Sequence, residues 1–460
     1  MRIASQNKSA RRPAILLALA CVLLLSPSGT AAQNKGRVAQ LERAATLIGG
    51  NRLAEAEREL NEVLKAAPDE SEALNLLGAV RAKQGRLDEA ETLFTRAVRA
   101  RPAHKGAHMN LAFLHLLRQE PEKSAAALRE VLRLDPTDAE AAHRLAWLLL
   151  SLGRTDECIA LIEKLKQTQT PALSLLALLG DAYLRKGDAS RAEENYLRAL
   201  DGRKDNAHIL IALAQVAQMK GDSKTAAARL SLARPLVSDS PDLLQKFASA
   251  ALAADLKAEA TAALRRAVEL QPDKHRLHFA LGAAWLKHPA DLQEAEQSFR
   301  QTLRLSPEDA QAQLHLGYVL LKQKRHAEAR EWLELSVRKG AGTPEAFYYL
   351  GLIAQAENED ARAVELLTKS VGLAPAFAHA HVALGATHLK LKDYERARQS
   401  LEIAVKLSPE DSKARYNLAM LYARLKQPER AREEMQAVER LKSEGKARED
   451  DGEAIAPPPR

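Results

Sequence analysis

The segment "SEALNLLGAVRAKQGRLDEAETLFTRAVRARP", residues 71–102, contains the pattern that decides the fold. Its apolar residues recur at the three- and four-residue spacing of a helix, in two blocks. Gly85 separates the blocks, and Pro102 closes the second one because proline lacks an amide donor and disfavours helical geometry in the residue before it. The segment therefore predicts two antiparallel helices joined by a short turn.

The same pattern returns along the chain about every 34 residues, with one single-residue slip near residue 290. Three sets of positions keep this period independently: the closing prolines, a glycine in the first helix, and a small residue in the second helix. The prolines are Pro68, Pro102, Pro136, Pro272, Pro307, Pro375 and Pro409, and the glycines are Gly78, Gly180, Gly282, Gly317, Gly351 and Gly385. We count twelve repeats, which begin near residues 37, 71, 105, 139, 173, 207, 241, 275, 310, 344, 378 and 412.

Small residues within a repeat indicate where its two helices approach closely. Gly78 and Ala90 are small because helices come together only where side chains are nearly absent, and Phe94 and Ala97 are expected to fill the seam between them. Cys158 occupies the position of Ala90 in the fourth repeat. We therefore expect Cys158 to be a buried, small apolar residue rather than a redox group.

The repeat resembles the tetratricopeptide repeat family through Leu77-Gly78, Ala90, Phe94, Ala97 and Pro102, and Tyr183 and Tyr422 supply the family's tyrosine in other repeats. The resemblance implies an all-α fold, a right-handed α-solenoid (superhelix) of tandem helix-turn-helix repeats over residues 33–444. The first repeat lacks the Leu-Gly pair, and Pro235 falls inside the expected second helix of the sixth. An extra residue in "LKHPADLQ" is expected in the turn of the eighth repeat.

The first 32 residues have the order of a secretory signal peptide. Arg2, Lys8, Arg11 and Arg12 precede an apolar run over residues 14–25, and small residues lead to a cleavage site after Ala32. The apolar run is shorter than the roughly twenty residues that cross a membrane. We expect a bacterial protein that is periplasmic or secreted. The alternative left open is a lipid-anchored outer-membrane protein modified at Cys21.

Composition excludes several other classes. The 460 residues are 46% hydrophobic, so the chain can fold, and a net charge of +8 is too dilute for nucleic-acid binding. Two cysteines cannot form a disulfide scaffold. The last residues, 445–460, have little apolar content and are expected to be a disordered polar tail. Membrane contact is expected only through an uncleaved signal or through a partner.

The family resemblance implies that the first helix of each repeat lines a concave groove through its second, fifth, sixth, ninth, twelfth and thirteenth residues, which we call the groove positions. About three aromatic residues would fall there by chance, and seven do: Phe113, Trp147, Phe279, Tyr318, Tyr348, Tyr349 and Tyr416. We predict two partner-binding groups. One comprises Asn110, Phe113, His143, Arg144 and Trp147, and the other Phe279, His315, Tyr318, Tyr348 and Tyr349. The alternative role for the fifth and ninth residues is packing against the next helix.

Motifs for catalysis and metal binding are absent from the sequence. It contains no His-Glu-x-x-His, no Gly-rich phosphate loop and no Gly-x-Ser-x-Gly. His379, His381 and His388 cluster in the eleventh repeat, but no cysteine or paired carboxylate completes a zinc site. We therefore expect no enzymatic activity, no cofactor and no metal.

These observations predict an exported scaffold that holds protein or peptide partners in its groove. Exported repeats of this family resemble components of envelope, pilus or exopolysaccharide assembly and secretion. The alternative is a carbohydrate-binding accessory of polysaccharide export, because Trp and Tyr faces also stack on sugar rings.

Overall fold

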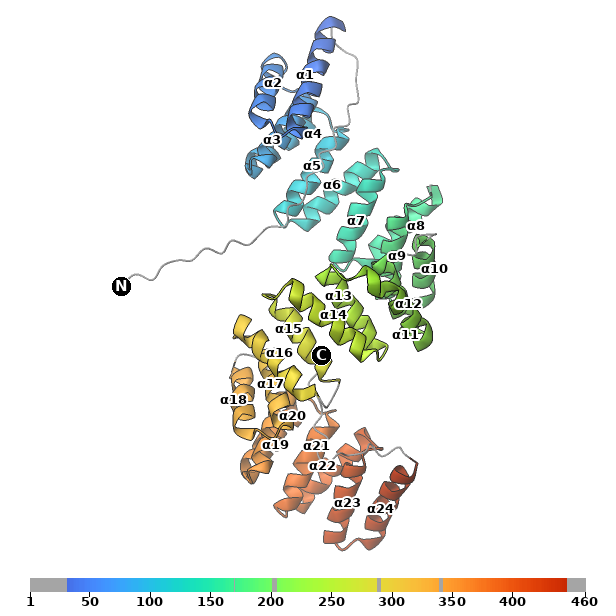
Figure 1. Ribbon diagram of the computed structural model, residues 1–460, viewed down its shortest axis with the longest axis vertical. Helices are drawn as coiled ribbons and strands as arrows, with labels where there is room; N and C mark the ends of the chain where they lie inside the picture. Colours follow the sequence, from blue (N-terminus) through green and yellow to red (C-terminus); the bar gives the residue numbers. More distant parts are fainter. Residues whose placement is uncertain (1–30, 169, 201–204, 288–290, 339–341, 445–460) are drawn as a thin grey trace, which may run out of the picture. The chain divides into compact units, whose positions relative to one another are not determined.

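The computed structural model describes residues 31–168, 170–200, 205–287, 291–338 and 342–444, with side chains from Gly36 onward. The chain divides into two compact halves, Met1–Lys204 and Asp205–Arg460, which we describe separately. Within the described residues every regular element is a helix, and Figure 1 shows successive helices lying side by side in each half.

The N-terminal half contains α1 (Ala31–Gly49), α2 (Leu53–Ala66), α3 (Ser71–Lys83), α4 (Leu87–Ala100), α5 (Lys105–Leu117), α6 (Pro121–Leu134), α7 (Ala139–Ser151), α8 (Thr155–Thr168), α9 (Leu173–Arg185) and α10 (Ala189–Leu200). The C-terminal half contains α11 (Ala207–Met219), α12 (Ser223–Ala233), η1 (Arg234–Leu236), α13 (Pro241–Ala253), α14 (Lys257–Leu270), α15 (His275–Trp285), α16 (Leu292–Leu305), α17 (Ala310–Lys322), α18 (His326–Arg338), α19 (Pro344–Ala356), α20 (Asp360–Leu373), α21 (Ala378–Lys390), α22 (Tyr394–Leu407), α23 (Ser412–Arg424) and α24 (Pro428–Ser443).

Each odd-numbered helix packs against the even-numbered helix that follows it and forms a helical hairpin. In addition, first helices of adjacent repeats contact each other, as α3 does with α5 and α21 with α23. Neither helix of a hairpin can bury its apolar face alone, so stacking of neighbouring hairpins builds the core. These contacts confirm the all-α solenoid class.

The seam within a hairpin depends on a glycine in the first helix. A Cβ atom added to Gly78 would lie 2.7 Å from the Phe94 ring, and one added to Gly180 would lie 2.6 Å from the Tyr196 ring. Phe94, Ala90 and Tyr196 are buried in this seam. The prediction that Gly78 and Ala90 permit close approach is therefore confirmed, as is the burial of Cys158.

In the turn between the two helices, the fifteenth residue of the repeat has a left-handed backbone conformation. Gly85 has a φ of 79° there, and a Cβ atom on it would meet nothing within 4 Å. Other repeats use non-glycine residues with the same backbone, for example Gln119 at 61° and Lys324 at 61°. These residues carry the strain that glycine avoids.

Three irregular places follow from the sequence. Helix α12 ends at Ala233 and passes into the short η1 around Pro235, because proline cannot continue the helical hydrogen bonds. In the eighth repeat α15 ends at Trp285 and α16 begins at Leu292, so the extra residue falls between them. Residues 288–290 of that segment lie outside the described residues.

At the amino end, α1 begins at Ala31, six residues before the start expected for the first repeat. Cleavage after Ala32 would leave all but two residues of α1. The rest of the predicted signal peptide and the predicted polar tail over 445–460 lie outside the described residues. Among the helices that are described, none has the length and apolarity required to cross a membrane.

Candidate functional site

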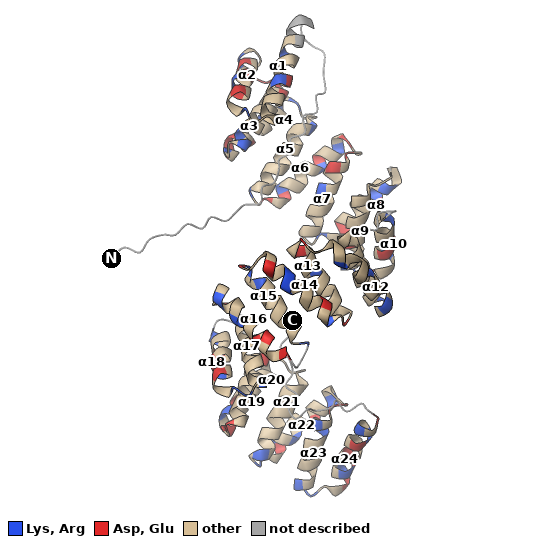
Figure 2. Ribbon diagram, viewed as in Figure 1, with Lys and Arg blue, Asp and Glu red and all other residues tan. Residues whose placement is uncertain are grey.

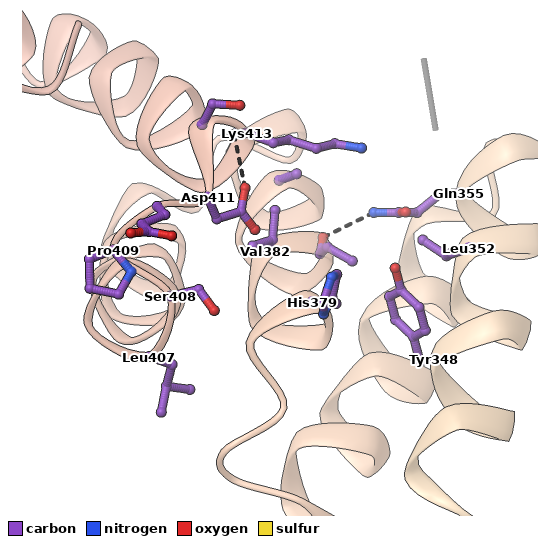
Figure 3. A pocket seen from close by; sticks show the side chains of 14 residues that line it. Tyr348, Leu352, Gln355, His379, Val382, Leu407, Ser408, Pro409, Asp411 and Lys413 are labelled. Carbon is purple, nitrogen blue, oxygen red and sulfur yellow. Dashed lines mark hydrogen bonds between the residues drawn. The ribbon is translucent and has the colours of Figure 1, made fainter. Parts of the chain in front are cut away.

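Three neighbouring first helices of the C-terminal half, α19, α21 and α23, surround a cavity of about 460 Å³, which we call the apolar cavity (Figure 3). Most of its helical lining residues occupy groove positions. The lining comprises Tyr348, Leu352, Gln355, His379, Val382, Ala383, Ala386 and residues 407–413. The cavity therefore opens on the face of the repeats that the family pattern assigns to partner binding.

Hydrogen bonds and ring contacts hold the walls of the apolar cavity. Gln355 Nε2 donates to the Ala383 carbonyl at 3.0 Å and to Thr387 Oγ1 at 2.6 Å, which joins α19 to α21. The Tyr348 ring lies 5.1 Å from the Phe377 ring, centroid to centroid. Figure 3 shows Tyr348 and Gln355 on one side of the cavity and Lys413 extending toward Gln355 from α23. The walls are thus preorganised for a ligand.

A second hollow of about 360 Å³, the basic recess, lies between α21 and α23. It shares Ala386 with the apolar cavity and contains three cationic residues, Lys390, Lys392 and Arg424. Its remaining lining is Leu389, Tyr394, Asn417 and Met420, so no carboxylate belongs to it. The two hollows together combine apolar surface with positive charge along the groove positions of α21 and α23.

In the N-terminal half, the predicted group around Phe113 and Trp147 is brought together by α5 and α7. The Arg144 guanidinium lies 4.3 Å from the centroid of the Phe113 ring and donates a hydrogen bond to Glu140 Oε1 at 2.7 Å. Trp147 is 53% exposed, which is unusual for so large an apolar side chain. Burial lowers the pKa of the neighbouring His143, and the Arg144 charge lowers it further. This cluster offers an exposed aromatic face beside a cation.

Asn110 belongs to the packing of the N-terminal half. It is buried, and its Nδ2 donates to Asn75 Oδ1 at 2.8 Å, which joins α5 to α3. Its side-chain amide therefore orders the groove wall and is largely removed from contact with a partner.

The predicted group in repeats eight to ten separates into packed and groove-lining residues. Phe279 is half-buried and lies 5.0 Å from His315, ring to ring, while Tyr349 is fully buried between Tyr318 and Tyr348. His315 and Tyr318 are also buried. Tyr349 and His315 are packed against neighbouring rings although both occupy the sixth position of their repeats, for which only partner binding was predicted. Tyr348 lines the apolar cavity.

Burial also shifts the pKa values of Tyr318 and His315. It raises the pKa of Tyr318 to about 12 and lowers the pKa of His315, although a hydrogen bond between His315 Nδ1 and the Gln311 carbonyl, at 2.8 Å, opposes the second shift. Both side chains are therefore neutral near pH 7, as buried aromatic packing requires.

Several lining residues of the apolar cavity and basic recess escaped the prediction. Leu352, Val382 and Ala386 occupy groove positions, but they are not aromatic and so were not among the predicted binding residues. The usable signal was the small size of Ala383 and Ala386, at the sixth and ninth positions of the eleventh repeat, since small residues leave space on this face.

The histidines of the eleventh repeat have a structural explanation. His381 Nε2 donates to the carbonyl of Pro375, at 3.0 Å, and His108 and His278 make the same bond to Pro102 and Pro272. Over the described residues no group of three or more His, Cys, Asp or Glu side chains is placed to hold a metal ion. Burial raises the pKa of the Cys158 thiol to about 12, so that thiol is unreactive.

Comparison with known families decides the identity of the repeats. A tetratricopeptide repeat model matches residues 41–105, 81–139, 178–241, 290–344 and 382–445, and a second tetratricopeptide repeat model matches residues 118–180. The chain belongs to the tetratricopeptide repeat family. Its architecture is that of a scaffold for protein–protein interaction.

Relatives of this tetratricopeptide repeat protein match parts of the chain. Cellulose synthase operon protein C of Pseudomonas fluorescens (strain SBW25) is 29% identical over 201 residues, which are 39% of this chain and 15% of the relative. Human protein O-mannosyl-transferase TMTC3 is 24% identical over 255 residues, 55% of this chain and 24% of the relative. The chain thus spans less than a quarter of either relative. Among solved structures, yeast Tom70 is similar with a TM-score of 0.39 and 16% identity, over 91% of this chain and 98% of Tom70.

Proposed function

We propose that this tetratricopeptide repeat chain is a non-enzymatic scaffold that binds an extended segment of a partner protein on the concave face of α19, α21 and α23. The observation that carries the proposal is the apolar cavity, whose lining comes from groove positions of three consecutive repeats. Extended segments bind well to such surfaces because preformed pockets receive alternate side chains.

A cavity-filling variant tests the proposal. Ala386 lies between the apolar cavity and the basic recess and is only partly buried, so Ala386→Trp fills the groove with little effect on the core. Gln399→Trp, on the exposed side of α22, is the matched control. Crosslinking in cells followed by affinity capture should recover a partner with the wild-type chain and with Gln399→Trp, and should lose it with Ala386→Trp. Equal recovery with all three chains, folded by circular dichroism, would refute the proposal.

We further propose that the scaffold acts after export, in envelope, pilus or exopolysaccharide assembly or secretion. The amino-terminal sequence has the order of a signal peptide, and one relative is named for a cellulose synthase operon. Cell fractionation with and without residues 1–32 tests this proposal. The full chain should appear in the periplasm or medium in a shortened form, and the truncated chain should stay in the cytoplasm.

Carbohydrate binding is the second candidate function, and the exposed Trp147 favours it. Trp147 is 53% exposed, and an exposed indole ring is suited to stacking on a sugar ring. If the candidate is correct, a soluble glucan should raise the melting temperature of the wild-type chain and leave that of Trp147→Ala unchanged.

A further inference from the structure

We propose that the concave face of α21 and α23 binds a peptide segment that carries one large apolar side chain and, a few residues away, a carboxylate. The apolar side chain enters the apolar cavity and the carboxylate pairs with the basic recess. This inference rests on the proposed function, because the same groove holds the ligand, and it names the chemistry that the groove selects.

The apolar cavity fits the first part of such a ligand. Its volume of about 460 Å³ lies within the range of pockets that enclose small ligands, and its floor is formed by the buried Val382 and Ala383. The Tyr348 ring, held by Phe377, closes one side. A Leu, Phe or Trp side chain that enters this space exchanges water for the apolar surface of Leu352, Val382 and Ala386, which is favourable.

The basic recess fits the second part. Lys390 is already held by Asp360 Oδ1 at 2.8 Å and by Asn358 Oδ1 at 2.9 Å, so Asp360 offsets its charge and the net positive charge of the recess comes from Lys392 and Arg424. Lys392, in the turn after α21, and Arg424, the last residue of α23, are exposed. Figure 2 colours the Lys and Arg residues of the chain blue. The planar guanidinium of an arginine pairs with both oxygens of a carboxylate, and this geometry favours an acidic group.

The distance between the hollows sets the spacing within the ligand. Val382 and Lys390 are eight residues apart on α21, which corresponds to about 12 Å along the helix axis. An extended chain advances about 3.3 Å per residue, so roughly four residues separate the apolar side chain from the carboxylate. The segment therefore runs along the axes of α21 and α23.

Charge at the other end of the apolar cavity gives the ligand a direction. Glu410 and Asp411 line the cavity where α23 begins, and Asp411 Oδ1 also accepts hydrogen bonds from the backbone amides of Lys413 and Ala414, at 2.9 and 3.0 Å. Lys413 also lines this end and offsets one of the two acidic charges, which leaves a net negative charge there. A carboxylate is therefore less favoured at this end of the groove than in the basic recess.

Fluorescence anisotropy with synthetic peptides tests this inference on the purified chain. The probes are fluorescein-labelled twelve-residue Gly/Ser peptides with Leu, Phe or Trp at the fifth residue and either Glu-Glu or Lys-Lys at the ninth and tenth. We expect the acidic peptides to bind at least tenfold more tightly than the basic ones in low salt, and the difference to shrink as salt is added. Equal binding of the two sets would overturn the inference.

Charge-reversal variants locate the effect. Lys392→Glu combined with Arg424→Glu should weaken binding of the acidic peptides at least tenfold. Lys406→Glu, at an exposed residue of α22, is the control and should leave binding unchanged at the same salt concentration. Preferential binding of the Lys-Lys peptides that Ala386→Trp abolishes would overturn the inference while supporting the groove as the binding face. Peptide binding that Ala386→Trp does not affect would contradict the proposed function itself.

The chain's own residues 445–460 provide the remaining comparison, since they include Glu449, Asp450, Asp451 and Glu453 followed by Ile455. A chain that ends at Glu444 should bind the acidic peptides as the full chain does. Binding that appears only in the shortened chain would show that the tail, not a separate peptide, occupies the groove, and would overturn the inference.

Discussion

At the scale of single residues, glycines serve two different purposes in this chain. Gly180 is required for space, because a Cβ atom there would lie 2.6 Å from the Tyr196 ring. Gly85 is required for its backbone, because its φ is positive while the space around it is empty. The same substitution at the two sites therefore has different physical causes.

Gly180→Ala should lower the free energy of unfolding by about 1–3 kcal/mol through overpacking against Tyr196. Gly85→Ala should lower it by about 1 kcal/mol through backbone strain alone. Urea denaturation followed by circular dichroism measures both. A second substitution separates the causes: Tyr196→Leu should relieve part of the loss in Gly180→Ala, and an unrelieved loss would show that the seam is not responsible.

His315 makes stability depend on pH. Its pKa is lowered by burial from an ordinary value of 6.5, so the unfolded chain takes up a proton that the folded chain resists. The contribution is therefore complete above about pH 6.5 and is lost as the pH falls from there toward the lowered pKa of the folded state. Thermal melts from pH 7.5 to 5 should show a shallower decline in His315→Asn than in the wild type. Parallel curves would contradict this assignment.

At the scale of helices, ion pairs between repeats supplement the apolar core. The Arg81 guanidinium on α3 pairs with Glu57 on α2 at 2.7 Å, and both side chains are largely buried. Similar pairs join Arg154 to Glu122 and Arg362 to Glu334, at 2.6 and 2.8 Å. The side chains in these other pairs are more exposed, so they are expected to contribute less.

A double-mutant cycle measures the contribution of the buried pair. Glu57→Gln, Arg81→Gln and the double variant should give a coupling of about 0.5–1.5 kcal/mol in the free energy of unfolding. The hydrogen bond from Arg81 also lowers the pKa of Glu57 from an ordinary 4.5, so this stabilisation is present above that pH and lost as the pH falls through the lowered value. A coupling energy near zero at pH 7 would show that Arg81 and Glu57 lie close together without stabilising the fold.

At the scale of the whole molecule, the main helix contacts join helices that are adjacent or next but one in order. Stability is then close to a sum of repeats and their interfaces, and unfolding need not be all-or-none. The two compact halves make this expectation specific.

Hydrogen exchange should detect this locality. Gly180→Ala should speed amide exchange in α9 and its neighbours while leaving α21–α24 unchanged, and Gly385→Ala, whose Cβ would lie 2.6 Å from Leu401, should do the reverse. Faster exchange in both halves from either substitution would contradict the additive description.

The helices and the seam could be predicted from the sequence because they depend on short-range periodicity. Gly78 and Phe94 lie within one repeat, and their positions in its two helices predicted that they pack together, as they do. The site was less predictable. Trp147 and Tyr349 both occupy groove positions, yet one is exposed and the other buried, because burial depends on what the neighbouring repeat places against each. The apolar cavity exists where Ala383 and Ala386 leave space, which a search for large residues overlooks.

The bond from the fourth residue of a repeat to the preceding proline fixes the tautomer of three histidines. A carbonyl can only accept, so Nε2 of His108, His278 and His381 carries the proton. In the ninth repeat Gln313 makes the same bond, because its Nε2 donates to the Pro307 carbonyl at 2.8 Å. This position therefore requires a hydrogen-bond donor and not a positive charge, so glutamine can replace histidine there.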